Sequence, residues 1–357
     1  MSLKYNQITR IKVFGVGGAG CNAVDRMVKD GMQGAEFFVV NTDLQVLNDC
    51  VVNNQILIGK ETTGGRGAGA DPKIGKQAAL ESENELRESV KDADMIFIAA
   101  GMGGGTGTAA APFLARLAKE TGALTVGIVT KPFEYEGAKR MRIALGGIEE
   151  LKEFVDALIV IANNKLRETM GDKPLASAFK EADNILRQSV QAITDLVGVR
   201  ATINLDFADV RSVMQGQGSA LIGVGISAQD GESSNRAVEA ADSALNSPLL
   251  EANIHGAKKA IINVTGGNGM TLNEYETAVQ YITAKAGGDI EIISGLATNE
   301  RLGNNIVVTV IATGFNEFQQ TTGATKAASG SSSLGTIVEP EDDDGDDGFS
   351  PTFFNER

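Results

Sequence analysis

The chain has 357 residues, of which 42% are hydrophobic and 22% charged, and it contains 43 glycines. This composition fits a globular protein of about two domains with a sizeable core. The formal net charge of -14 argues against a nucleic-acid-binding protein, which presents a basic face, and against adhesion to anionic lipid. Two cysteines are too few for a disulfide framework or a zinc site, and the single histidine argues against a His-based metal site.

Membrane and targeting signals are also missing from the sequence pattern. No run of about 18 apolar residues occurs, so we expect no membrane insertion. The first twelve residues contain no apolar signal region, and so few cysteines suit a reducing compartment. We therefore expect a cytoplasmic protein.

Short apolar runs alternate with helical patterns in the first part of the chain. The runs cover residues 11–14, 37–40, 95–100, 124–130 and 158–162. They are continuous rather than alternating, which is typical of strands buried on both faces of a parallel sheet. Ligands of such sheets bind at the carboxyl ends of the strands, and glycine-rich loops follow several of these runs.

The first glycine loop reads GVGGAGCNAV over residues 15–24. Gly15, Gly17 and Gly20 form the pattern G-x-G-x-x-G, which favours a dinucleotide site and hence a nicotinamide-dependent oxidoreductase. Asp43, after the next apolar run, stands where a ribose-binding acid would be expected. The alternative for Asp43 is a helix cap.

A second glycine loop, GMGGGTGT at residues 101–108, follows a neighbouring predicted strand. A dinucleotide needs one such loop, so two loops indicate a triphosphate held from two sides. Glycines let backbone N–H groups approach phosphate oxygens, and a helix N-terminus adds its dipole. The pattern G-x-x-x-x-G-K-[ST] does not occur, so the sequence argues against a P-loop protein.

A long helix is predicted at residues 175–196, where a wide apolar stripe indicates packing on more than one side. After this helix, strands and helices are expected in a different order from that of the first part of the chain. Strands are expected at 220–227, 260–264, 290–293 and 306–312, and helices at 236–245 and 272–286. The sequence therefore predicts an α/β fold with a parallel sheet, a long central helix and a smaller α/β part with a four-stranded mixed sheet.

The end of the chain differs in composition from the rest. Residues 316–357 contain nine acidic and two basic residues, which is half of the net negative charge. Such a segment buries too little apolar surface to order itself. We expect a disordered acidic linker at 316–348, followed by a more apolar peptide at 349–357.

The string GGGTGT resembles the signature loop of the tubulin/FtsZ family, and other motifs follow in that family's order. They are NTD at 41–43, GAGADP at 67–72, TKPFEYEGAKR at 130–140, AFKEADNILRQ at 178–188, NLDFADV at 204–210 and VIATGF at 310–315. The resemblance covers residues 11–315 and the tail. It implies a GTP-binding domain at 1–174, the central helix at 175–198 and a second domain with a catalytic loop at 199–315.

The resemblance also implies which residues hold GTP or GDP. The phosphates would lie on the loops, with residues 68–72 sensing the γ-phosphate. On the sequence alone, the alternative for 68–72 is a glycine-rich turn. The residues assigned to these loops are Gly17, Gly18, Ala19, Gly20, Cys21, Asn22, Asn41, Asp43, Ala68, Gly69, Ala70, Gly101, Gly103, Gly104, Gly105, Thr106, Gly107 and Thr108. For the first loop the alternative is a tight turn without a ligand.

At the other end of the nucleotide, the resemblance assigns Pro132 and Glu136 to the ribose side and Arg140 to the phosphates. The alternative for Glu136 and Arg140 is an ordinary ion pair on an exposed helix. Asn163 and Asp183 would select guanine, because a carboxylate can accept from its N1–H and exocyclic amine, whereas adenine presents an acceptor at N1. Phe179 would stack on the base.

Asn204, Asp206 and Asp209 are the candidate catalytic residues. The alternative is a polar loop that caps a helix beginning near Val210. The resemblance implies that this loop enters the pocket of the next subunit, so that head-to-tail assembly into open filaments completes the active site. Mg²⁺ would be held mainly by phosphates and water, without a protein metal site. A filament protein that binds GTP without hydrolysing it is the remaining alternative.

The resemblance implies a GTP-dependent, self-assembling cell-division protein located at mid-cell on the inner face of the membrane. The terminal SPTFF at 350–354 is similar to the family's C-terminal peptide. Residues 349–357 would therefore bind membrane-tethering and regulatory division proteins, since apolar anchors on a flexible tether suit a partner groove.

Overall fold

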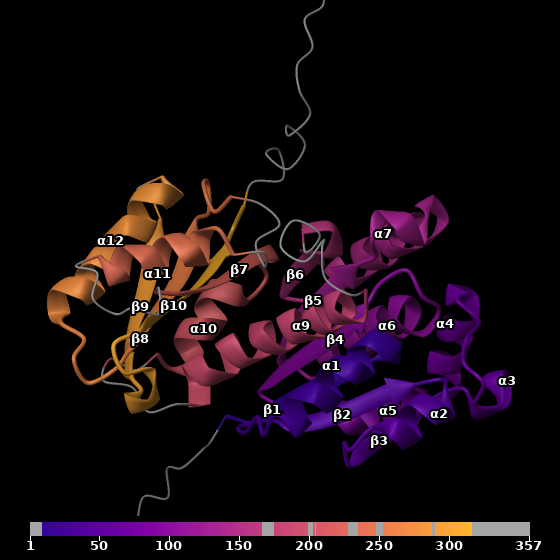
Figure 1. Ribbon diagram of the computed structural model, residues 1–357. Helices are drawn as coiled ribbons and strands as arrows, with labels where there is room; N and C mark the ends of the chain where they lie inside the picture. The colour runs from indigo at the N-terminus through magenta and orange to yellow at the C-terminus, as the bar shows by residue number, and fades with distance from the viewer. Residues whose placement is uncertain are drawn as a thin grey trace, which may run out of the picture. The chain divides into compact units, whose positions relative to one another are not determined.

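The computed structural model describes residues 9–165, 175–198, 203, 205–227, 235–247, 253–287 and 290–315 (Figure 1). The predicted linker, the C-terminal peptide and Asn204 lie outside the described residues. No helix in the described ranges is long and apolar enough to cross a membrane.

The described strands form one sheet in the order β3-β2-β1-β4-β5-β6-β7-β10-β8-β9. Their bounds are β1 (Ile11–Val16), β2 (Glu36–Asn41), β3 (Asn54–Leu57), β4 (Met95–Gly101), β5 (Leu124–Lys131), β6 (Ala157–Ala162), β7 (Gly218–Ile226), β8 (Lys259–Gly266), β9 (Glu291–Thr298) and β10 (Ile306–Thr313). All pairs from β3 to β7 are parallel. β10 is antiparallel to β7 and β8, and β8 is parallel to β9, so the last four strands form the predicted mixed sheet.

Helices pack on this sheet in the layers expected of an α/β protein. Their bounds are α1 (Gly17–Lys29), α2 (Leu44–Asp49), α3 (Lys60–Thr63), α4 (Pro72–Glu81), α5 (Glu83–Val90), α6 (Thr106–Glu120), α7 (Ala138–Lys152), α9 (Leu175–Gly198), α10 (Phe207–Met214), α11 (Arg236–Leu245) and α12 (Leu272–Ala286), with 3-10 turns η1 (Glu134–Glu136) and η2 (Glu300–Leu302). The predicted helices at 236–245 and 272–286 are confirmed to the residue.

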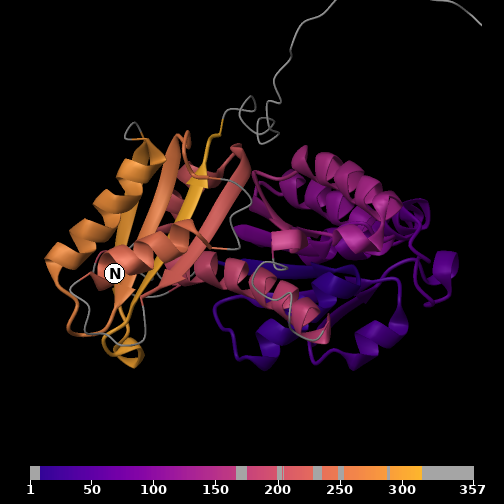
Figure 2. The same cartoon turned by 45° about the horizontal axis from the view of Figure 1, so that its top comes forward.

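The long helix α9 joins the two parts of the sheet, as its wide apolar stripe predicts. Its buried residues Ile185, Val190 and Ile193 share one hydrophobic core with strands on both sides, including Val126 of β5 and Ile311 of β10. Figures 1 and 2 show α9 running between the parallel strands and the mixed strands. Only three residue pairs join β6 to β7, and the core that α9 shares with both parts adds to the contact between them.

Two elements differ from the sequence expectation. The edge strand β3 was not expected, because NQIL is short and half polar. The helix α10 begins at Phe207 rather than near Val210, because Asp206 and Asp209 form a reciprocal capping box at its start.

Candidate functional site

The two predicted glycine loops meet at the carboxyl ends of the parallel strands. β1 and β4 are neighbours, and the loops after them open α1 and α6. A Cβ on Gly17 would lie 2.8 Å from the backbone N of Gly107, and one on Gly20 would lie 2.3 Å from the carbonyl oxygen of Ala99. Only glycine allows this approach, so the loops form one surface of closely packed backbone.

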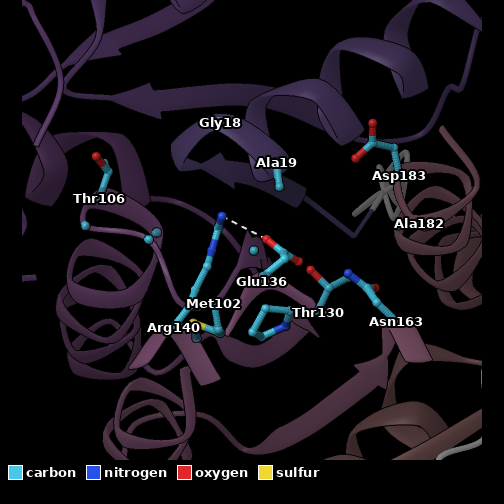
Figure 3. Close-up of a pocket in the computed structure, with 15 residues that line it drawn as sticks. Gly18, Ala19, Met102, Thr106, Thr130, Glu136, Arg140, Asn163, Ala182 and Asp183 are labelled. Carbon is cyan, nitrogen blue, oxygen red and sulfur yellow. Dashed lines mark ion pairs between the residues drawn. The ribbon is translucent and has the colours of Figure 1, made fainter. Parts of the chain in front are cut away.

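A cavity of about 230 Å³ opens above this surface (Figure 3). It is lined by Gly18, Ala19, Gly101, Met102, Gly104, Gly105, Thr106, Gly107, Thr130, Pro132, Glu136, Arg140, Asn163, Ala182 and Asp183. Figure 3 shows Thr106 at one end, Asp183 at the other, and Arg140 with Glu136 between them. A Cβ on Gly18 or Gly104 would meet no protein atom within 4 Å, so these glycines leave open space.

Two hydrogen-bond acceptors gather at the Asp183 end of the cavity. Asn163 is buried, and its side-chain oxygen has no hydrogen-bond partner among the described residues. Burial raises the pKa of Asp183 to about 6, although the nearby Arg26 opposes this shift. A buried acceptor without a partner costs free energy, so this end of the cavity is suited to a ligand with adjacent N–H donors.

Glu136 and Arg140 are paired, but not along one helix as the sequence pattern suggested. Glu136 ends η1, and Gly137, with φ of 96°, separates it from α7. The Glu136 carboxylate accepts from the backbone N of Phe133 at 2.7 Å and lies 2.8 Å from Arg140 Nη1. The Glu136 side chain is 11% exposed and that of Arg140 52%, so Arg140 is the more accessible charge of the pair.

Asn41 and Asp43 use their side chains within the protein. The Asn41 amide oxygen accepts from the backbone N of Thr42 at 2.9 Å and of Asp43 at 3.3 Å. The Asp43 carboxylate accepts from Gln45 N at 2.9 Å and caps α2, which is the alternative that the sequence left open. Burial raises the pKa of Cys21 to about 12, so this residue stays a thiol beneath the first loop.

Several of the predicted residues do not line the cavity. They are Gly17, Gly20, Cys21, Asn22, Asn41, Asp43, Ala68, Gly69, Ala70, Gly103 and Thr108. Phe179 lies in α9, one turn before Asp183, and the predicted stacking falls outside what the structure describes.

The segment 68–71 packs directly on the second glycine loop. A Cβ on Gly105 would lie 2.8 Å from the Cβ of Ala68 and 2.9 Å from the carbonyl oxygen of Asp71. Ala70 has φ of 61°, a conformation that costs a non-glycine residue about 1 kcal/mol or more. A strained loop thus touches the cavity wall without lining the cavity.

Met102, Thr130 and Ala182 line the cavity but were not among the predicted contacts. Met102 lies inside the glycine string, and its backbone N donates to the carbonyl oxygen of Thr130 at 3.0 Å. Thr130 ends a predicted strand, and Ala182 precedes Asp183. Each of the three residues therefore lies within or next to a motif from which the site was predicted.

Asp206 and Asp209 lie at the opposite edge of the sheet from the cavity. The Asp206 carboxylate accepts from Asp209 N at 2.9 Å, and the Asp209 carboxylate accepts from Asp206 N at 3.0 Å. Arg211 of the same helix donates to the carbonyl oxygen of Gly122 at 3.1 Å, just before β5, whereas Thr130 near the other end of β5 lines the cavity. Eight residues of strand span roughly 26 Å, so these carboxylates do not reach the cavity of their own chain. Figure 1 shows α10 apart from α6 and α7, which carry residues that line the cavity.

Two family comparisons cover most of the described chain. Residues 10–171 match the GTPase domain of the tubulin/FtsZ family, and residues 218–316 match the C-terminal domain of the FtsZ family. The glycine loops and most of the cavity lining fall in the first of these ranges.

Solved structures agree with these matches. An FtsZ dimer of M. jannaschii is 44% identical, with a TM-score of 0.80, over 86% of this chain and 88% of that one. The fold is also shared with CetZ1 of Haloferax volcanii in its GDP-bound monomer, at 21% identity and a TM-score of 0.75, over 87% of this chain and 95% of that one. CetZ2 of the same organism, as a GTPγS-bound protofilament, is 19% identical with a TM-score of 0.73, over 87% and 94% of the two chains. The chain therefore belongs to the FtsZ family, within the wider tubulin/FtsZ family of GTPase-domain proteins.

Proposed function

We propose that this chain binds GTP in the cavity, assembles head to tail and hydrolyses GTP at the contact between subunits. The observation that carries this proposal is the separation of the cavity from the paired carboxylates Asp206 and Asp209. The glycine loops of the cavity suit phosphates, but the carboxylates in its described lining are Glu136, which is paired with Arg140, and Asp183, at the far end from Thr106. Asp206 and Asp209 lie at the other end of the strands, at the start of α10.

The orientation of the nucleotide follows from the lining. Glycine loops at the Thr106 end suit phosphates, because backbone N–H groups and the helix dipoles of α1 and α6 favour negative charge. Asp183 and Asn163 at the other end suit guanine, whose N1–H and exocyclic amine are donors. Arg140 is accessible to the phosphates, and Glu136 to the ribose. The GDP-bound CetZ1 structure and the GTPγS-bound CetZ2 structure support a guanine nucleotide here.

Mg²⁺ fits this site mainly through phosphate oxygens and water, which are its preferred ligands. The two carboxylates in the described lining are Glu136, paired with Arg140, and Asp183, at the base end. No cluster of three or more His, Cys, Asp or Glu side chains occurs in the described ranges. When bound, the ion would neutralise charge on the phosphates.

Hydrolysis requires a group that positions water at the γ-phosphate. The capping box occupies Oδ1 of Asp206 and Oδ2 of Asp209, which leaves one oxygen of each carboxylate for water. The loop of one subunit, at the amino ends of its strands, would complete the pocket of the next subunit, at the carboxyl ends. Such a contact joins two different surfaces and is therefore heterologous, which generates open filaments. The similar FtsZ dimer and the CetZ2 protofilament support such assembly.

The proposed role in the cell is inferred from the membership of this chain in the FtsZ family. We infer a role in cell division, with filaments at mid-cell on the cytoplasmic side of the membrane and Asn204 sharing the catalytic loop. Residues 349–357 would bind membrane-tethering or regulatory division proteins. Deleting these residues should abolish co-sedimentation with tether-bearing vesicles and leave the GTPase rate intact, and continued co-sedimentation would remove the basis for this assignment.

The most direct test of the proposed activity is the GTPase rate per subunit as a function of protein concentration. We expect little phosphate release from dilute protein and a steep rise once subunits assemble. A rate per subunit that stays constant over the whole range would show that each chain acts alone. Identification of the nucleotide extracted from purified protein separates this function from that of a nicotinamide enzyme.

A further inference from the structure

Thr42 is a buried threonine between the two segments that border the phosphate end of the cavity. Its side chain is fully buried, and it does not line the cavity. Its hydroxyl lies 2.7 Å from the hydroxyl of Thr106, which does line the cavity. We propose that Thr42 is a positioning residue that couples the segment 63–71 to the Thr106 hydroxyl and thereby favours GTP over GDP. This inference rests on the proposed function of the cavity.

The backbone of Thr42 connects it to the other segment. Its carbonyl oxygen accepts from the Thr63 hydroxyl at 3.2 Å and from the Gly67 backbone N at 3.1 Å. Its own backbone N donates to the Asn41 side chain at 2.9 Å. Gly67 directly precedes Ala68, which packs on Gly105. The segment 63–71 therefore contacts the second glycine loop twice, at Gly105 directly and at Thr106 through Thr42.

The direction of the hydroxyl pair decides what Thr106 can offer to a ligand. Either hydroxyl can be the donor, and each has a single proton. If Thr106 donates to Thr42, it presents only lone pairs to the cavity, which repel a phosphate oxygen. If Thr42 donates to Thr106, the Thr106 proton is free for a phosphate oxygen, which can only accept. A bound phosphate oxygen therefore selects the arrangement in which Thr42 donates, and the Thr42 hydroxyl then holds the Thr106 side chain with its proton toward the phosphate.

The position of Thr106 indicates which phosphate group of the nucleotide its hydroxyl would contact. Figure 3 shows Thr106 and Asp183 at opposite ends of the cavity. With guanine at Asp183, the Thr106 end receives the outermost phosphate, which GTP has and GDP lacks. Loss of the Thr42 hydroxyl should therefore weaken GTP binding more than GDP binding.

The test uses nucleotide-stripped full-length protein, diluted so that subunits do not assemble. Dissociation constants for GTP and for GDP are measured by displacement of a fluorescent guanine nucleotide. The central variant is Thr42→Val, which keeps the shape and removes the hydroxyl. Thr42→Ser keeps the hydroxyl and serves as the rescue. Thr125→Val is the matched control, because Thr125 is also fully buried and, among the described residues, its hydroxyl donates to the carbonyl oxygen of Ala123 at 3.2 Å.

For Thr42→Val we expect GTP to bind about tenfold more weakly, which corresponds to about 1.4 kcal/mol, while GDP changes by less than about twofold. Thr42→Ser and Thr125→Val should keep the wild-type preference for GTP. Equal weakening of GTP and GDP, or a Thr42→Ser variant as weak as Thr42→Val, would overturn the role of Thr42. If Thr42→Val does not fold by circular dichroism, Thr42→Ala takes its place under the same criteria. Failure of the wild-type chain to bind GTP at all would instead overturn the function proposed for the cavity, and this inference with it.

Discussion

The two ends of the parallel strands carry different parts of the proposed chemistry. At the carboxyl ends, glycines bring backbone close to a cavity in which Glu136 is paired with Arg140 and Asp183 lies at the far end from Thr106 (Figure 3). At the amino ends, Asp206 and Asp209 form the capping box of α10. In a monomer the proposed binding site and the proposed catalytic loop therefore cannot meet. The comparison teaches that the proposed enzyme is a property of two chains in contact.

The largest expected effect comes from removing charge at the amino edge. Asp209→Asn keeps an oxygen that can accept from Asp206 N, so the capping box and α10 should persist. The GTPase rate of assembled protein should nevertheless fall by about 10²–10³, or roughly 3–4 kcal/mol, because one contact to the transition state loses its charge. Affinity of the dilute monomer for GTP should stay unchanged.

Asp209→Ala provides the counterpart, because it removes both the charge and the cap. Phosphate release and GTP affinity are measured for both variants. If Asp209→Asn hydrolyses GTP at the wild-type rate and only Asp209→Ala is slow, Asp209 serves as a helix cap and the amino edge is not catalytic.

The next largest effect should come from removing the group that selects guanine in the cavity. Asp183→Ala removes an acceptor for guanine, and one such recognition contact discriminates by about 1–3 kcal/mol. We expect the preference for GTP over ATP to fall by roughly 10- to 100-fold in a competition assay. An unchanged preference would mean that Asp183 does not read the base.

A smaller effect on GTP affinity should follow from adding a side chain to a glycine of the first loop. A Cβ on Gly18 meets no protein atom within 4 Å, so Gly18→Ala should fold and gain about 0.5–1 kcal/mol of helix stability. The added methyl group would occupy space above the loop, and GTP affinity should fall about tenfold.

Gly146→Ala in α7 is the matched control, since a Cβ there also meets nothing within 4 Å and Gly146 does not line the cavity. It should gain stability without a change in affinity. Equal GTP affinities for the two variants would show that phosphates do not lie on Gly18.

The smallest effect is a pH dependence of binding. The pKa of Asp183 is raised to about 6 by burial, and only the ionised carboxylate accepts from both guanine donors. GTP affinity should therefore be constant above about pH 7 and decrease as pH falls through about 6, by up to about tenfold at pH 5. Titration of affinity against pH checks this, and the slope should vanish in Asp183→Ala. A slope that persists in that variant would assign the titration to another group.

Much of the architecture could be read from the sequence because local signals agreed with the fold. Continuous apolar runs gave the buried parallel strands, and the wide stripe of α9 gave a helix packed on two sides. β3 was not predicted because NQIL forms an edge strand, where partial burial requires few apolar residues and so leaves little hydrophobic pattern in the sequence. α10 begins early because Asp206 and Asp209 form a capping box. The sequence offered a helix cap as the alternative for this segment, but with the helix beginning near Val210.

The site was predictable in composition but not in geometry. Gly137 breaks the helix between Glu136 and Arg140, a break that the spacing of four residues does not reveal. The side chains of Asn41 and Asp43 accept from the backbone N of Thr42 and of Gln45, contacts that the motif NTD does not reveal. The pairing of the Thr42 and Thr106 hydroxyls could not be predicted either, since it joins residues far apart in the sequence.

The central claim is that a pocket on one chain and a loop on another together hydrolyse GTP, and a mixture tests it most directly. Arg140→Ala has a damaged pocket and an intact loop, whereas Asp209→Asn has an intact pocket and a damaged loop. Phosphate release is measured for each variant alone and for an equimolar mixture, with copolymer formation followed by sedimentation of differently labelled subunits. We predict that the mixture exceeds the mean of the two separate rates severalfold, because some contacts join an intact pocket to an intact loop. Copolymers whose rate equals that mean would contradict hydrolysis across the interface.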